Sequence, residues 1–132
     1  MTWSSFTAPE RIPAIGFLGI LLILGLLAHT KPAFAHAIVV ESTPAVNAEV
    51  GGPDVHIDLR FNSRIDHARS RLILTDAAGH KVRVTIPGDA PADHILTTVK
   101  GVAPGKCTLE WRVLSVDGHL TRGLIPFTVT VP

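Results

Sequence analysis

Strict alternation of apolar and polar residues is the feature that most limits the fold of this chain. The segment 55–61, Val-His-Ile-Asp-Leu-Arg-Phe, places its four apolar residues on one side and its polar residues on the other. A period of two with one polar side is typical of a β-strand that is buried on one face. The segments 106–114 and 123–131 repeat this pattern. The chain after residue 36 is therefore predicted to be all-β, without an amphipathic helix of useful length.

Seven strands are predicted in this part of the chain. They occupy 37–40, 55–61, 71–75, 81–86, 95–99, 106–114 and 123–131. Turn signals separate the strands at the spacing of about eight to twelve residues that is typical of a β-sandwich. Trp111 lies at the centre of the longest strand and is expected to anchor the core between two sheets. Pro126 lies on the polar side of the last strand, which predicts a sheet edge or a bulge there.

The N-terminal segment differs in character from the rest. Residues 12–28 carry no charge and follow Arg11, and Ala33-Phe34-Ala35 places small residues at the two positions that a signal peptidase reads. This order is typical of a secretory signal. We therefore predict a helical signal peptide over 1–35, cleaved between Ala35 and His36, and a mature domain over 36–132 that is periplasmic or secreted and has no membrane segment. A retained membrane anchor is the alternative, although the apolar run is at the short limit for a bilayer span.

Charge and cysteine content exclude several classes of protein. The chain has twelve Lys and Arg against eleven Asp and Glu and no basic run, so the electrostatic footprint of a nucleic-acid-binding protein is missing. Because Glu10, Arg11 and Lys31 leave with the signal, the mature domain is neutral, with ten residues of each sign. The single cysteine, Cys107, excludes an intrachain disulfide, a Cys-ligated zinc finger and an iron–sulfur cluster. Cys107 lies on the apolar side of its strand and is expected to be buried.

Two features point to a metal ion. His36 is the first residue of the predicted mature chain, where its α-amine and imidazole can close a chelate ring on a metal that prefers nitrogen ligands, such as copper(II). Asp117 and His119 are alternate residues of one loop, so a carboxylate and an imidazole, the commonest metal ligand, can reach one ion. Neither feature is specific alone, but the two together favour a metal site. The histidines at 56, 67, 80 and 94 are assigned no metal.

Short motifs follow one another along the whole mature chain. They occupy 36–37, 41–45, 59–63, 76–79, 104–105, 111–119 and 123–129. The most specific is 111–119, which reads W-R-x-x-S-x-D-x-H. This order resembles the CopC family of periplasmic copper-resistance proteins. The resemblance implies a Greek-key β-sandwich of the immunoglobulin or cupredoxin type, with a copper(II) site at one end.

The resemblance also implies a ligand set and a role. One copper(II) ion per chain would be held by the amine and imidazole of His36, the carboxylate of Asp117 and the imidazole of His119. The role would be copper carriage, sequestration or delivery in copper resistance or homeostasis, without catalysis, by a monomer whose partner is a CopD-type inner-membrane copper permease. Two departures stand out. Ser63 replaces a Glu that lies near the metal in the family, and Cys107 replaces a Tyr. Since Met1 is the single methionine, a thioether copper(I) site is also excluded from the mature chain.

Three other functions remain open. Copper monooxygenases also hold their metal with an N-terminal His, but they need open coordination positions and a substrate surface, whereas the mature aromatic residues Phe61, Trp111 and Phe127 all occupy inward positions. An electron-transfer cupredoxin needs an accessible Cys ligand and usually a Met. A metal-free β-sandwich that serves as an interaction module is the third.

Overall fold

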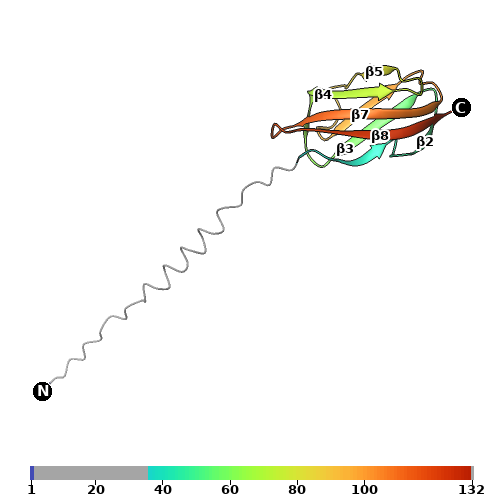
Figure 1. Cartoon of the computed structure of the whole chain (residues 1–132). Coiled ribbons are helices and arrows are strands. Elements are labelled where there is room, and N and C mark those ends of the chain that lie inside the picture. The colour runs from blue at the N-terminus through green and yellow to red at the C-terminus, as the bar shows by residue number, and fades with distance from the viewer. Residues whose placement is uncertain (2–35, 132) are drawn as a thin grey trace. The chain divides into compact units, whose positions relative to one another are not determined.

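The structure is a computed structural model that describes Met1 and residues 36–131. The signal-peptide prediction for 1–35 lies outside the described residues. Eight strands form a two-sheet sandwich (Figure 1). They are β1 (Val39–Thr43), β2 (Glu49–Gly51), β3 (Val55–Phe61), β4 (Ile65–Thr75), β5 (Lys81–Val84), β6 (His94–Val99), β7 (Gly105–Ser115) and β8 (Leu120–Thr130). The described part of the chain contains no helix that is both long enough and apolar enough to cross a membrane.

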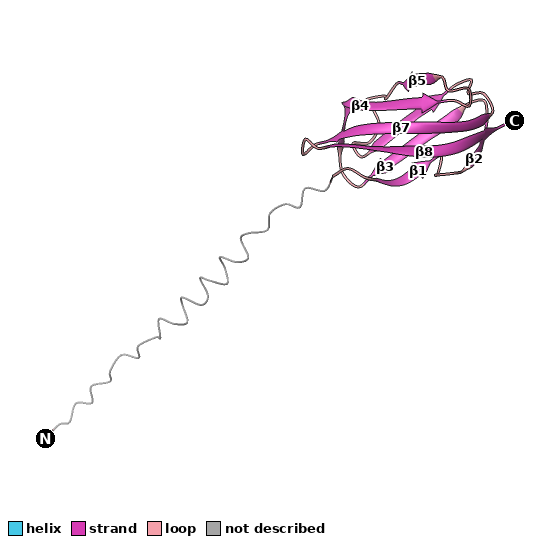
Figure 2. Cartoon of the chain, viewed as in Figure 1, coloured by secondary structure: helices cyan, strands magenta, loops and turns pink. Residues whose placement is uncertain are grey.

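The two sheets have three and five strands. Their strand orders are β1-β3-β6 and β2-β8-β7-β4-β5. The chain changes sheet after β1, β2, β3, β5 and β6, so neighbours in sequence are often in different sheets. All pairs are antiparallel except β2 with β8, which run parallel. Figure 2 shows β4, β7 and β8 side by side along the sandwich. The predicted all-β sandwich is confirmed.

The structure has eight strands where seven were predicted, and the two largest differences, at β2 and β4, have their reason in strand pairing. β2 was not predicted because Val50 is its one large apolar residue, and it forms where its backbone pairs with Thr128–Thr130 of β8. β4 starts at Ile65, ahead of the predicted 71–75, and its register against β7 shifts between Asp66 and Arg71. Because that irregularity interrupts the alternation of apolar side chains, the sequence pattern did not predict the first part of the strand.

Pro126 lies in a strand that has neighbours on both sides, not at the edge of the sheet. β8 pairs with β7 along its length, and β2 covers its other side at Thr128 and beyond. Beside Pro126, the carbonyl oxygen of this proline accepts a hydrogen bond of 2.6 Å from the backbone N–H of Asn47. The missing N–H of proline is tolerated because the ladder with β2 begins two residues later.

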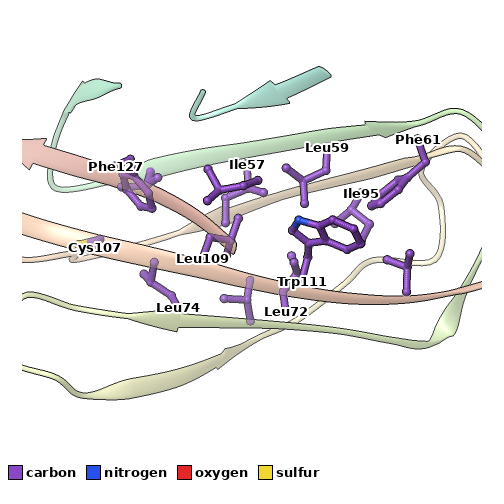
Figure 3. Close-up of a cluster of buried hydrophobic side chains, with 14 of the residues drawn as sticks. Ile57, Leu59, Phe61, Leu72, Leu74, Ile95, Cys107, Leu109, Trp111 and Phe127 are labelled. Atoms are coloured by element: carbon purple, nitrogen blue, oxygen red, sulfur yellow. The ribbon is translucent and has the colours of Figure 1, made fainter. Parts of the chain in front are cut away.

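The core lies between the two sheets (Figure 3). Trp111 is 8% exposed and meets Phe61 edge to face, with ring centroids 5.6 Å apart. Gly123 lies opposite Trp111, and a Cβ at this position would lie 2.5 Å from Cζ2 of the indole. The ring therefore occupies the space that any other residue would need. Cys107 is also buried as predicted, and burial raises the pKa of its thiol, which keeps it protonated.

Candidate metal centre

The loop between β7 and β8 presents Asp117 and His119 at one end of the sandwich. The backbone closes it tightly, because Gly118 N–H donates to the Ser115 carbonyl and Ser115 N–H donates to the His119 carbonyl, both at 2.9 Å. Gly118 has a φ of +86°, a left-handed conformation that favours glycine. The turn therefore places the carboxylate and the imidazole together, as the sequence predicted for this pair.

Asp117 is held as an anion with one oxygen left over. Its Oδ1 accepts hydrogen bonds from the Ser115 hydroxyl and from the backbone N–H of His119. The Ser115 bond in particular lowers the pKa of Asp117 below its ordinary value. Its Oδ2 is buried and accepts no hydrogen bond, although it lies 3.1 Å from Nδ1 of His119. Buried polar atoms are rarely left unsatisfied, so Oδ2 is a suitable ligand atom for a cation.

His36 lies against His119. Their ring centroids are 4.5 Å apart and their planes are tilted by 53°. Both residues are exposed, so the paired imidazoles are open to an ion from solution. Two imidazoles and a carboxylate oxygen are donors of the kind that copper(II) prefers.

Three side chains that were not among the predicted site residues hold this arrangement. Ser115, which is 2% exposed, fixes the Asp117 carboxylate. The Thr121 hydroxyl donates a hydrogen bond of 2.6 Å to the carbonyl of Ala37. Asn62 Oδ1 accepts one of 2.8 Å from the N–H of Ile38. These bonds fix the segment that follows His36. The Ser in the 111–119 motif was a signal for the first, whereas nothing in the sequence marks the other two.

The three predicted ligands are close but do not yet form a ready-made site. Among residues 36–131, no three His, Cys, Asp or Glu side chains are arranged so that they could hold a metal ion as they stand. One reason is that Nδ1 of His119 faces the Asp117 carboxylate. The backbone nitrogen of His36 is a separate donor, and in the uncleaved chain it is in a peptide bond with Ala35. The side chain of His119 is 51% exposed, which leaves it room to turn.

The other histidines within residues 37–131 have partners elsewhere. His56 lies 3.0 Å from the Thr98 hydroxyl, and His80 lies 3.1 Å from the Asp76 carboxylate in a turn. Nε2 of His67 lies 2.7 Å from the carbonyl of His94, whose own Nδ1 lies 3.0 Å from Asp58. Each therefore has a structural contact away from the His36–His119 pair.

Comparison with known proteins assigns the fold to a family. Residues 39–130 match the family model described as the CopC domain. The chain belongs to the CopC family. The match runs from the start of β1 to the end of β8, so the whole sandwich is a CopC domain.

Several relatives of this CopC domain are named for copper. Copper resistance protein C of Xanthomonas campestris pv. juglandis is 34% identical over 74% of this chain and 82% of its own length. Copper transport protein CutJ of Bacillus subtilis is 28% identical over 83% of this chain, but the match covers only 21% of that longer protein. The crystal structure of CopC from Methylosinus trichosporium OB3b superposes with a TM-score of 0.63 at 29% identity, over 73% of this chain and 95% of that chain.

Ser63 of this CopC domain is half-buried in the loop between β3 and β4, and its hydroxyl oxygen is buried. Its neighbours link two segments: Asn62 N–H donates to the Ile38 carbonyl, and the Arg64 carbonyl accepts from Val116 N–H. The Ser63 hydroxyl has no hydrogen-bond partner. The loop between β3 and β4 therefore lies between the N-terminal segment and the Asp117 loop, with an unsatisfied hydroxyl where the sequence resemblance places a carboxylate.

Proposed function

We propose that the domain binds one copper(II) ion outside the cytoplasm and carries, sequesters or delivers it. The observation that carries this proposal is the packing of the His36 and His119 rings at 4.5 Å beside the unsatisfied Oδ2 of Asp117. Two of its relatives, a copper resistance protein and a copper transport protein, support the same metal.

Signal cleavage completes the ligand set in this proposal. Cleavage after Ala35 frees the α-amine of His36, and the amine and imidazole of one residue then chelate the ion. Asp117 supplies an anionic oxygen and His119 a second imidazole. The mature chain functions outside the cytoplasm as a monomer. A CopD-type membrane permease is its partner in copper transfer. The long relative CutJ, in which the matching region is about one fifth of a copper transport protein, is in keeping with a transport partner.

Binding without catalysis is the favoured activity. The aromatic side chains that a polysaccharide-oxidising enzyme would use are buried, since Phe61, Phe127 and Trp111 are 1%, 3% and 8% exposed. Asp117 also takes a position that an oxygen-activating site would leave open. An electron-transfer site is disfavoured by distance. Cys107 lies near the opposite end of β7 from the Asp117 loop, roughly 25 Å along the strand at about 3.3 Å per residue.

A copper titration with two forms of the protein tests the proposal. One form begins at His36, as verified by intact mass, and the other carries one added Gly before His36. We expect the first to bind one equivalent of copper(II), with a weak d–d absorption band. The second should bind at least about tenfold more weakly, because an amide nitrogen replaces the amine and the chelate ring is lost.

The competing outcomes are distinct. If the two forms bound copper(II) with equal affinity in a competition with a chelator, the amine would not be a ligand. Asp117 and His119 would then remain of the proposed site. An intense blue thiolate band would instead indicate a cupredoxin centre at Cys107. If the form that begins at His36 bound no copper, the favoured function would be that of a metal-free interaction module.

A further inference from the structure

The outer face of the five-stranded sheet collects the positive charge of the domain. Ten of the twelve Lys and Arg lie after residue 35, because only Arg11 and Lys31 precede it. Six of these ten share the outer face, as the register of β4, β5, β7 and β8 shows: Arg71, Lys81, Arg83, Lys106, Arg112 and Arg122. The domain is neutral in sum, so this face is balanced by acidic residues placed elsewhere.

Few acidic residues offset this charge locally. Glu110 lies on the same face and pairs with Arg112 at 3.6 Å. Glu49 lies at the β2 edge opposite Thr128. Asp66, at the other end of β4, pairs with Arg69 at 2.9 Å. The face therefore keeps an excess of positive charge. We call it the basic face.

Three arginines stand in one row across this face. Arg71 of β4 is opposite Arg112 of β7, and Arg112 is opposite Arg122 of β8. Neighbouring strands are about 4.8 Å apart, and like charges directly opposite each other destabilise a sheet. Within residues 36–131, neither Arg71 nor Arg122 has a carboxylate at ion-pair distance, and both are exposed. An anion on the row would relieve this repulsion.

Apolar side chains are interleaved with the arginines. Leu120 and Leu124, which flank Arg122 on the same side of β8, are 58% and 63% exposed. A hollow of about 430 Å³ lies beside Leu124 and is lined by this leucine, Glu110, Arg122 and Gly123. The exposed side of β8 thus alternates leucine with arginine next to a concave surface.

We propose that the basic face docks on a membrane surface that carries anionic phospholipids. The arginine fork binds phosphate oxygens in pairs. Basic side chains are attracted to an anionic leaflet, and apolar side chains are stabilised at the boundary of headgroups and acyl chains. An acidic protein could satisfy the charges. The combination of a sheet face, a row of cations and leucines on the same strand matches a planar lipid surface better.

Docking on this face would orient the domain. The outer face of the three-stranded sheet has no comparable excess, since Arg60 pairs with Glu41 at 3.0 Å and Asp58 faces His94. The loop that carries Asp117 and His119 joins β7 to β8, the two strands that carry Arg112 and Arg122. It would therefore lie close to the membrane. The proposal does not depend on copper.

Vesicle sedimentation tests the proposal with the form that begins at His36, whose buried core lies wholly within residues 37–129. The probe is phosphatidylcholine vesicles with about one third phosphatidylglycerol. The test variant is Arg71→Gln with Arg122→Gln. The matched control, Arg64→Gln with Lys100→Gln, removes the same charge from two exposed residues in loops outside the basic face.

We expect the parent to bind the anionic vesicles and not pure phosphatidylcholine, and to be released as salt rises from about 0.05 M to about 0.5 M. The test variant should partition roughly 30-fold more weakly, and the control should bind like the parent. No binding, binding to both kinds of vesicle, or equal loss in the two variants would overturn the proposal.

Two further arms separate other anions from lipid. If inorganic phosphate at about 10 mM displaced the parent from the vesicles without a matching effect of chloride at equal ionic strength, the row would be a free-phosphate site. If the parent bound poly-L-glutamate through Arg71 and Arg122 but ignored the vesicles, the face would fit an acidic protein. Either result would overturn a membrane as the occupant.

Discussion

The imidazoles of His36 and His119 pack with their centroids 4.5 Å apart, although the two residues lie at opposite ends of the domain in sequence. His36 precedes the first strand and His119 precedes the last. The contact exists because the bond from Thr121 to the Ala37 carbonyl fixes the N-terminal segment beside the start of β8. A pair built in this way depends on the intact sandwich.

His119→Ala and Asp117→Ala should each weaken copper(II) without unfolding the metal-free domain. Both residues are in a loop outside the core. The copper affinity should fall about 100-fold or more in His119→Ala. Removing a residue that only hydrogen-bonds to a metal ligand costs roughly 10- to 100-fold in affinity, and removing the ligand itself should cost more. Titration against a chelator measures the affinity, and thermal melts measure the fold. His56→Ala, an exposed histidine on β3, is the control and should bind like the parent. If these two metal-free variants melted far below the parent, the two residues would have a structural role.

Ser115→Ala should affect both the stability and the metal site. The hydroxyl is buried and holds the Asp117 carboxylate, so we expect a loss of about 1–2 kcal/mol of unfolding free energy. Because the Ser115 bond lowers the pKa of Asp117, the variant should show a higher pKa for this carboxyl by NMR titration. Copper binding should then fail at a higher pH during acidification. Ser70→Ala removes the other serine that is buried within residues 36–131 and should lower stability with copper affinity unchanged.

Gly123→Ala should destabilise the domain by about 1–3 kcal/mol, because the new Cβ would force the Trp111 ring to move from a position 2.5 Å away. Trp111 is the single tryptophan of the form that begins at His36, since Trp3 lies in the predicted signal. Its fluorescence therefore reports both unfolding in urea and any shift of the ring. Gly51→Ala, where nothing lies within 4 Å of the new Cβ, is the control. Equal stability of the two variants would contradict this packing.

Asp76→Asn should lower stability at neutral pH and not in acid. Backbone N–H groups of His80 and Ala78 bond to this carboxylate, with the His80 ring beside it, and the pKa of Asp76 is lowered. A lowered pKa in the folded state adds stability above the ordinary Asp value of about 3.9, and this contribution is lost as the pH falls through the folded value. Urea unfolding from about pH 7 to about pH 2.5 should show the difference between parent and variant shrinking. Asp89→Asn, exposed in a loop, should show no such trend.

Arg122→Gln should stabilise the domain. The residue faces Arg112 across β7 and β8, and like charges in opposite positions cost from a few tenths to about 1 kcal/mol. The melting temperature should rise at low salt, and the gain should decrease as salt screens the repulsion. Arg64→Gln supplies the comparison, with no strand partner to repel it. A lower melting temperature for Arg122→Gln at low salt would show that this side chain makes a stabilising contact.

Most strands and the proximity of Asp117 and His119 could be predicted because their signals are local. Alternation along 55–61 depends only on the geometry of one strand, in which successive side chains point to opposite faces. The proximity of Asp117 and His119 depends only on a short loop. For the same reason, Trp111 and Cys107 were correctly assigned to the core from the parity of one strand.

Pairing between distant segments could not be read in this way. β2 exists because β8 offers it an edge at Thr128–Thr130, and the approach of His36 to His119 rests on hydrogen bonds from Thr121 and Asn62. The charges show the difference most clearly. Along the sequence the basic residues are dispersed and balanced by acidic ones, whereas the register between strands brings Arg71, Arg112 and Arg122 into one row. Which strands become neighbours, and in which register, is set by packing across the whole core and not by any single segment.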